Sequence, residues 1–238
     1  MAIGREIYEL EKIIGYRFSD ITYLENAVTH SSYTNEQRTR GISAKSNERL
    51  EFLGDAILGA VVSEYLYTNF KKHREGSLTK MRQRIVCEST LAKIASQIYL
   101  GDFLNLGNGE ELNGCRRRPK VLADALEALI AALYIDSTQK SSEDYKAVII
   151  KLFTHEIALV AGMQNTDYKT MLQQLVEKDG SAMLEYRIVA TAGPEHNKSF
   201  TVSALINNNE VGRGTANKIQ SAEMEAARQA LQLFGVTT

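Results

Sequence analysis

The sequence has few of the residues that build soft-metal or redox sites. Its 238 residues include two cysteines, Cys87 and Cys115, and no CxxC pair. Two thiols cannot form a zinc site unaided, so a reducing cytosol is the expected compartment. The GxSxG, P-loop and GxGxxG patterns are absent as well. Their absence argues against a hydrolase nucleophile elbow, a P-loop phosphate site and a dinucleotide-binding fold.

A charge excess and long apolar runs are also missing. The formal net charge is −1, so composition does not indicate a nucleic-acid partner, although a neutral chain can hold a local basic surface. The first residues alternate charged and apolar types, unlike a signal peptide. The most apolar later run, residues 126–135, is too short to span a bilayer and contains Glu127. We expect a cytoplasmic protein with a packed core, no membrane contact and no organic cofactor.

Apolar spacing predicts that residues 1–160 form an all-helical domain. Asn47, Ser77 and Gly101 are candidate caps, and Pro119 lies near a helix start. Residues 34–46 are polar and show no apolar period, which predicts an exposed loop. Residues 101–120 are expected to form a loop that contains short helices at most. The expected helices cover residues 4–16, 21–30, 47–70, 75–86, 88–100, 121–135 and 143–160.

The pattern changes after residue 160. Residues 161–166 are small and polar, which predicts a linker. Residues 167–236 then predict a small α+β domain in the order helix, three strands, helix. The expected helices cover residues 168–180 and 221–235, and the alternating strands cover residues 184–190, 199–206 and 210–216.

Carboxylates interrupt two of the most apolar helices. In residues 47–62, Glu48, Glu51 and Asp55 are spaced three and four apart, which puts them on one helix face. In residues 121–135 the only charges are Asp124 and Glu127, three apart and without a basic residue in that helix. A narrow solvated stripe is one explanation for the second pair. Uncompensated charges in an apolar stripe are otherwise costly.

If these two helices packed together, a single cation could compensate the carboxylate charges of both. Four carboxylates in one cluster would repel or protonate unless a cation lay among them. A site made only of oxygen ligands suits Mg²⁺, with Mn²⁺ as a substitute. Gly54 and Gly59 would allow the helices to approach closely. Such sites are typical of phosphate chemistry, including all-helical enzymes that act on diphosphates.

Several segments together resemble the ribonuclease III family over nearly the whole chain. "NERLEFLGDAIL" is similar to its signature motif, and "AVTHSSY", "EGSLTKMRQRIV", "LGNGEELNG" and "LADALEALIAALY" follow the family's order and spacing. The last seventy residues resemble a double-stranded RNA-binding domain, above all in "GPEHNKSFTV". The resemblance implies an all-α endonuclease domain followed by an α-β-β-β-α RNA-binding domain.

The resemblance also implies an activity and its residues. It implies Mg²⁺-dependent hydrolysis of both strands of duplex RNA, including ribosomal RNA precursors, leaving 5′-phosphates, 3′-hydroxyls and short 3′ overhangs. It implies a homodimer with Phe52 at the contact, although apolar pattern would place Phe52 in the core. The positions that match the family's metal ligands are Glu51, Asp55, Asp124 and Glu127. Of these, Asp55 and Glu127 also match catalytic residues. Glu48 and Glu75 match two further acidic positions of the family's catalytic valley.

The RNA-binding domain departs from the family pattern. The implied RNA contacts are Thr170, Gln173, Gln174, His196, Lys198 and Lys218. A basic pair that normally begins the last helix is replaced by Ile219 and Gln220. From residue 167 onward there are seven Lys or Arg against eight Asp or Glu. Fewer phosphate contacts predict weaker duplex binding with a shallower salt dependence, partly offset by Lys169, Lys198 and Arg213.

Other interpretations stay open at the level of sequence. The basic run at residues 116–120 would serve equally as an RNA contact or a solvated loop. His30 is expected to be structural, and His73 and His155 to be exposed. The rival function is an RNA-binding or scaffold protein that keeps the fold without cleaving. Such relatives lose carboxylates, whereas all six acidic positions are present here. A diphosphate enzyme would leave the second domain unexplained.

Overall fold

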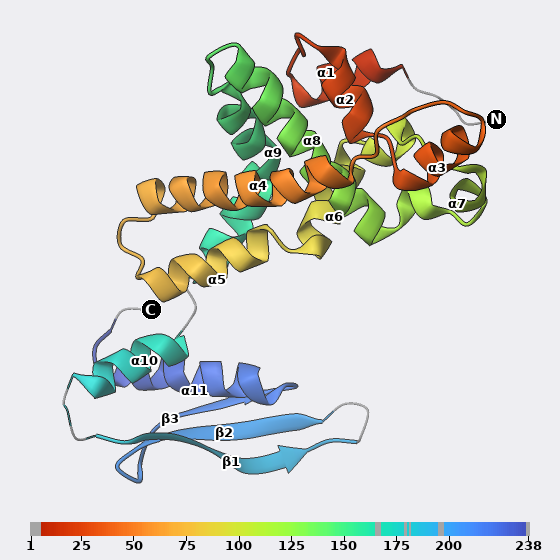
Figure 1. The fold of residues 1–238 in the computed structure, drawn as a ribbon. Helices are drawn as coiled ribbons and strands as arrows, with labels where there is room; N and C mark the ends of the chain where they lie inside the picture. Colours follow the sequence, from red (N-terminus) through yellow and green to blue (C-terminus); the bar gives the residue numbers. More distant parts are fainter. Residues whose placement is uncertain (1–5, 165–167, 179, 181, 195–197, 237–238) are drawn as a thin grey trace. The chain divides into compact units, whose positions relative to one another are not determined.

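The computed structural model describes residues 6–164, 168–178, 180, 182–194 and 198–236 (Figure 1). The chain divides into two compact units, residues 1–161 and 162–238, each with its own core. None of the described helices combines the length and apolarity needed to cross a bilayer.

The first unit is helical, as predicted. Helix α9 continues to Gln164, so four of the six residues expected as a linker are helical here. The remaining linker residues lie outside the described part. The helices are α1 (Ile7–Ile14), α2 (Ile21–Ala27), α3 (Ser31–Thr39), α4 (Glu48–Asn69), α5 (Glu75–Ile85), α6 (Glu88–Gln97), α7 (Asn108–Leu112), α8 (Pro119–Gln139) and α9 (Asp144–Gln164), with 3₁₀ turns η1 (Leu100–Phe103) and η2 (Cys115–Arg117).

Helix α8 is the centre of this unit. From Leu122 to Leu133 nearly every side chain is buried, which is the pattern of a helix surrounded by others. Helices α2, α4 and α6 pack against it, and Figure 1 shows α4 crossing it. Pro119 begins α8, where its missing N–H is not needed.

Helix α3 corrects the prediction of a loop at residues 34–46, because its second half lies in that segment. It buries no side chain, so no apolar period marks it. Polar contacts to another loop hold it instead. Ser32 Oγ accepts from the Gly107 N–H at 2.9 Å, and Glu36 accepts from the Asn108 N–H at 2.5 Å. His30 accepts from the Ser32 N–H at its start, so His30 is structural.

Three predicted caps are wrong. Asn47 precedes α4 with helical backbone angles, and its buried side chain donates to the Ala27 carbonyl instead. Ser77 lies within the first turn of α5 rather than before it. Helix α6 ends before Tyr99, which is left-handed with φ 56°. Gly101 lies in η1, where an added Cβ would stand 2.5 Å from the Arg116 carbonyl oxygen.

The second unit is the predicted α-β-β-β-α domain. Its antiparallel sheet has the order β1-β2-β3, and α11 packs on β2, β3 and α10. Asn207 and Asn208 both have positive φ, the geometry of a tight hairpin turn between β2 and β3. Its elements are α10 (Tyr168–Glu177), β1 (Leu184–Ala192), β2 (Ser199–Ile206), β3 (Asn209–Ala216) and α11 (Ile219–Leu233).

Candidate metal centre

Helices α4 and α8 approach each other closely at Gly54. A Cβ added there would stand 1.8 Å from the Glu127 carbonyl oxygen, so only glycine fits. The helix turn that carries Glu51 and Asp55 therefore lies directly against the turn that carries Glu127. The prediction for Gly54 is confirmed. The prediction for Gly59 is wrong, since a Cβ there would meet nothing within 4 Å.

Three of the four predicted metal ligands converge at this crossing. Glu51, Asp124 and Glu127 each offer a carboxylate oxygen, and these oxygens lie within 4.8 Å of one another. All three residues are half-buried. Burial and the charges of Asp55, Glu51 and Asp124 raise the pKa of Glu127 to about 7. Burial and the charge of Asp124 also raise the pKa of Glu51. Burial and mutual repulsion thus disfavour the charged forms of these two carboxylates.

Asp55 lies beside this cluster rather than within it. It is exposed on α4, one turn after Glu51. Among the neighbouring charges, Asp55 has the largest effect on the pKa of Glu127. The fourth predicted ligand is thus near enough to act on the cluster electrostatically, while its carboxylate is not part of the group of three.

Lys120 pairs with this cluster, a contact that the sequence analysis did not predict. The second carboxylate helix begins two residues before its predicted start, at Pro119, so Lys120 lies in its first turn. Its Nζ stands 3.2 Å from Asp124 Oδ2. The expectation that the helix contains no basic residue is therefore wrong. The four-residue spacing between Lys120 and Asp124 was the available signal.

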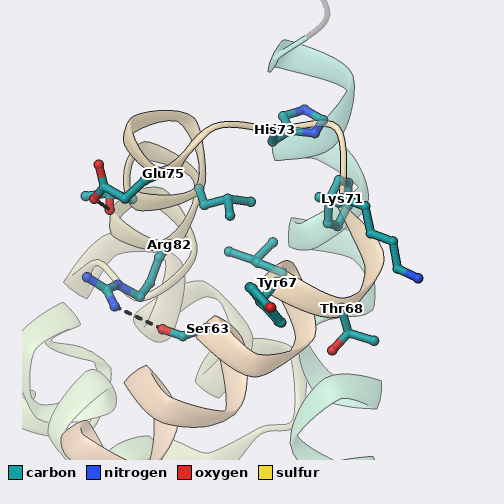
Figure 2. Close-up of a pocket in the computed structure, with 11 residues that line it drawn as sticks. Ser63, Tyr67, Thr68, Lys71, His73, Glu75 and Arg82 are labelled. Atoms are coloured by element: carbon teal, nitrogen blue, oxygen red, sulfur yellow. Dashed lines mark hydrogen bonds between the residues drawn. The ribbon is translucent and has the colours of Figure 1, made fainter.

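Glu48 and Glu75 lie apart from the group of three. Glu48 is exposed at the start of α4, accepts from Ser46 Oγ and contributes to the raised pKa of Glu51. Glu75 begins α5 and accepts from Thr79 Oγ1 at 2.9 Å. It lines a separate hollow of about 880 Å³ between α4 and α5, whose lining includes none of the four predicted ligands (Figure 2).

Two aromatic side chains differ from expectation. Phe52 is 82% exposed, so its assignment to the core from apolar pattern is wrong. His73 is half-buried and lines the hollow, with its ring edge-on to Phe70 at 5.5 Å, so the expectation that it is exposed is also wrong. His155 is exposed, as predicted.

The basic run at residues 116–120 is not a uniform surface. The Arg116 guanidinium donates to the carbonyls of Gly101 and Leu104 and pairs with Glu111, so it holds the neighbouring loop together. Arg118 lies 3.8 Å from a Glu110 oxygen. The end of the run, Lys120, pairs with Asp124.

The candidate RNA contacts lie on α10 and near the starts of β2 and α11. Thr170 and Gln173 are exposed, Gln174 is half-buried, and Gln173 donates to Glu177. Lys198 and Lys218 are exposed immediately before β2 and α11. His196 lies outside the described residues. Ile219 and Gln220 begin α11.

The charge state of the cluster predicts how stability depends on pH. Glu127 keeps its proton up to about pH 7 when folded, against an ordinary value of 4.5. The folded state thus binds more protons between these values, so stability falls as pH rises. We expect the unfolding temperature in EDTA to decline between pH 5 and 8, less steeply in Glu127→Gln. Parallel pH profiles for the two proteins would contradict the shift.

Comparisons with known proteins agree with this geometry. A Ribonuclease-III-like family model matches residues 20–155, and a double-stranded RNA binding motif matches residues 168–233. Ribonuclease 3 of Caldanaerobacter subterraneus subsp. tengcongensis is 44% identical over 95% of this chain and 97% of its own. Ribonuclease 3 of Clostridium perfringens is 41% identical over 96% and 94%.

A solved structure supports the helical unit in particular. The nuclease domain of ribonuclease III from Campylobacter jejuni, described with a region involved in dimer formation, is 39% identical. It matches 63% of this chain and 98% of its own with a TM-score of 0.56. From the two family models, the near end-to-end relatives and this nuclease domain, the chain belongs to the ribonuclease III family and is a ribonuclease.

Proposed function

We propose that the chain is a Mg²⁺-dependent endoribonuclease that hydrolyses both strands of duplex RNA, with Mn²⁺ as a substitute metal. The convergence of Glu51, Asp124 and Glu127 supports this, because three half-buried carboxylates need a cation. All their donor atoms are carboxylate oxygens, which suit Mg²⁺ rather than zinc. When bound, the ion supplies an activated water and stabilises charge on the leaving oxygen. Asp55, beside the cluster, completes the catalytic set.

The products and setting are part of the same proposal. Attack of water on phosphorus leaves 5′-phosphate and 3′-hydroxyl ends, and two offset cuts leave short 3′ overhangs. The natural substrates are ribosomal RNA precursors and other structured transcripts in the cytoplasm. The test is cleavage of an end-labelled duplex RNA in Mg²⁺ and in EDTA, with the new ends mapped. Binding without cleavage in Mg²⁺ would favour a scaffold protein instead.

The second domain holds the duplex, reading its shape across the minor groove. Two of the basic side chains expected to offset the missing basic pair at Ile219 and Gln220 are already engaged in ion pairs. Lys169 pairs with Glu223, and Arg213 pairs with Glu210 at 2.8 Å. Thr170, Gln173, Gln174, His196, Lys198 and Lys218 are the proposed RNA contacts.

Restoring a basic pair at the start of α11 should strengthen duplex binding. Each new phosphate contact steepens the dependence of log affinity on log salt by about 0.9. We therefore expect Ile219→Lys/Gln220→Lys to bind more tightly at low salt and with a steeper slope. Leu233→Lys, at the exposed far end of α11, is the charge control. An unchanged slope in the double variant would show that these positions do not meet phosphate.

We further propose that two copies pair through one face of α4. Phe52, Ala56, Ala60 and Tyr67 are all exposed and lie within about 80° of one another around the helix. Phe52 and Tyr67 are 82% and 77% exposed, so this face presents two large aromatic side chains to solvent. The hollow lined by Tyr67 and Glu75 adjoins the far end of this face (Figure 2).

A two-fold axis across the middle of α4 would set the partner subunit's Phe52 against this hollow. The two ends of the face are about 22 Å apart along the helix, so each copy would fill the other's hollow. Glu75 on its rim would then come near the partner's metal centre, which explains its distance from its own. Glu48 would remain at the edge of each centre.

Shortening Phe52 should weaken the dimer. Loss of an aromatic anchor from an interface costs about 2 kcal/mol or more, so the dimer of Phe52→Ala should dissociate at least about thirtyfold more readily. Sedimentation over a range of protein concentrations measures this. Leu112→Ala removes an equally exposed side chain from α7 and should leave the dimer unchanged. A monomeric wild type would reject the proposal.

A further inference from the structure

Lys120 gives the metal centre an internal cation. Its Nζ lies 3.3 Å from Asp124 Oδ1 and 3.2 Å from Asp124 Oδ2, so it bridges both oxygens. The Lys120 side chain is 73% exposed, while that of Asp124 is 27% exposed. The ammonium is therefore largely in solvent, while the carboxylate that it pairs with is partly buried beside Glu51 and Glu127.

The charge of Lys120 reaches beyond Asp124. Glu51 and Glu88 also act on it, and in turn it partly offsets the raised pKa values of Glu51 and Glu127. An ordinary exposed pair at this helix spacing contributes little to stability. Here the same lysine lies among several carboxylates that attract cations. Its positive charge therefore affects how strongly a second cation can bind to them.

We propose that Lys120 couples metal binding to RNA binding, by competing with the metal for Asp124 and by pairing with a duplex phosphate once the metal has displaced it. This role rests on the proposed metal centre. A positive charge beside the site opposes a divalent cation, so the free protein binds metal more weakly than its carboxylates would allow. Phosphate draws Lys120 away from Asp124, so RNA favours metal and, by reciprocity, metal favours RNA.

Metal affinity in the absence of RNA tests the first half. Mn²⁺ binding to the full chain is measured by calorimetry for wild type, Lys120→Gln and Lys120→Arg. The Lys120 charge repels a divalent cation and occupies Asp124, so removing it should tighten Mn²⁺ binding about three- to tenfold. Lys120→Arg should resemble wild type. Lys146→Gln, which removes an ion-paired lysine from α9, should have no effect.

RNA affinity tests the second half. Duplex binding is compared in EDTA and in Ca²⁺, with a gel confirming intact RNA. Lys120→Gln should match wild type in EDTA and bind about three- to tenfold more weakly in Ca²⁺. Equal Mn²⁺ affinities, or an RNA deficit of the same size in both conditions, would overturn the role of Lys120. A wild type that binds no Mn²⁺ would overturn the metal centre and this role together.

Discussion

Replacing Glu127 by glutamine should abolish duplex cleavage while leaving duplex binding within about twofold of wild type. The amide keeps the shape of the side chain but carries no charge, and it turns one ligand oxygen into a donor. A site that depends on carboxylates to hold Mg²⁺ then loses much of its affinity and activation of water. We expect cleavage to fall about 10³-fold, or roughly 4 kcal/mol of transition-state stabilisation.

Single-turnover cleavage of a labelled duplex in Mg²⁺ measures the loss, and gel shifts in EDTA measure binding. Binding should persist because the RNA-binding motif lies in the other unit, and because losing a negative charge does not weaken attraction to a polyanion. Glu143→Gln changes an exposed glutamate just before α9 that pairs with Lys146, so it should cut normally. Equal cutting by Glu127→Gln and wild type would disprove the proposed mechanism.

The cluster around Glu127 was predictable because its signal is local. Carboxylates at spacings of three and four in an apolar helix must share a face, and burial demands compensation for their charge. Residue spacing and charge therefore place Glu51 and Asp55 on one helix face and Asp124 and Glu127 on another. That Glu51 rather than Asp55 joins Asp124 and Glu127 depends on the contact between the two helices. The order helix, three strands, helix in the second unit followed from changes of period, which are equally local.

The errors arose where the deciding contact lies far along the chain. Helix α3 is held by hydrogen bonds from residues 107 and 108, more than seventy positions away, and shows no apolar period. The Asn47 side chain does not cap its helix because it donates a hydrogen bond to the Ala27 carbonyl, twenty residues earlier. Phe52 has the sequence pattern of a core residue, yet the described helices of the unit leave its side chain largely exposed. Its exposure depends on a packing arrangement that periodicity does not encode.

Adding one methyl group at Gly54 should unfold or open the first unit. A Cβ there would lie 1.8 Å from the Glu127 carbonyl oxygen and 2.5 Å from its carbon. These are backbone atoms of the central helix α8, so no side chain can rotate away. Separating α4 from α8 would loosen the core on both sides. We expect Gly54→Ala to lower the free energy of unfolding by about 3 kcal/mol or more.

Denaturant titration of the full chain measures this, with the two units followed as separate transitions. Gly162→Ala is the control, because that glycine lies in α9 where an added Cβ meets nothing within 4 Å. It should be neutral or stabilising by up to about 1 kcal/mol, the usual gain in a helix. Any folded Gly54→Ala should also cut poorly, since a shift of about 1 Å between catalytic groups costs about 100-fold in rate. An unaltered transition would show that the helices do not approach this closely, and the carboxylates could not then meet as described.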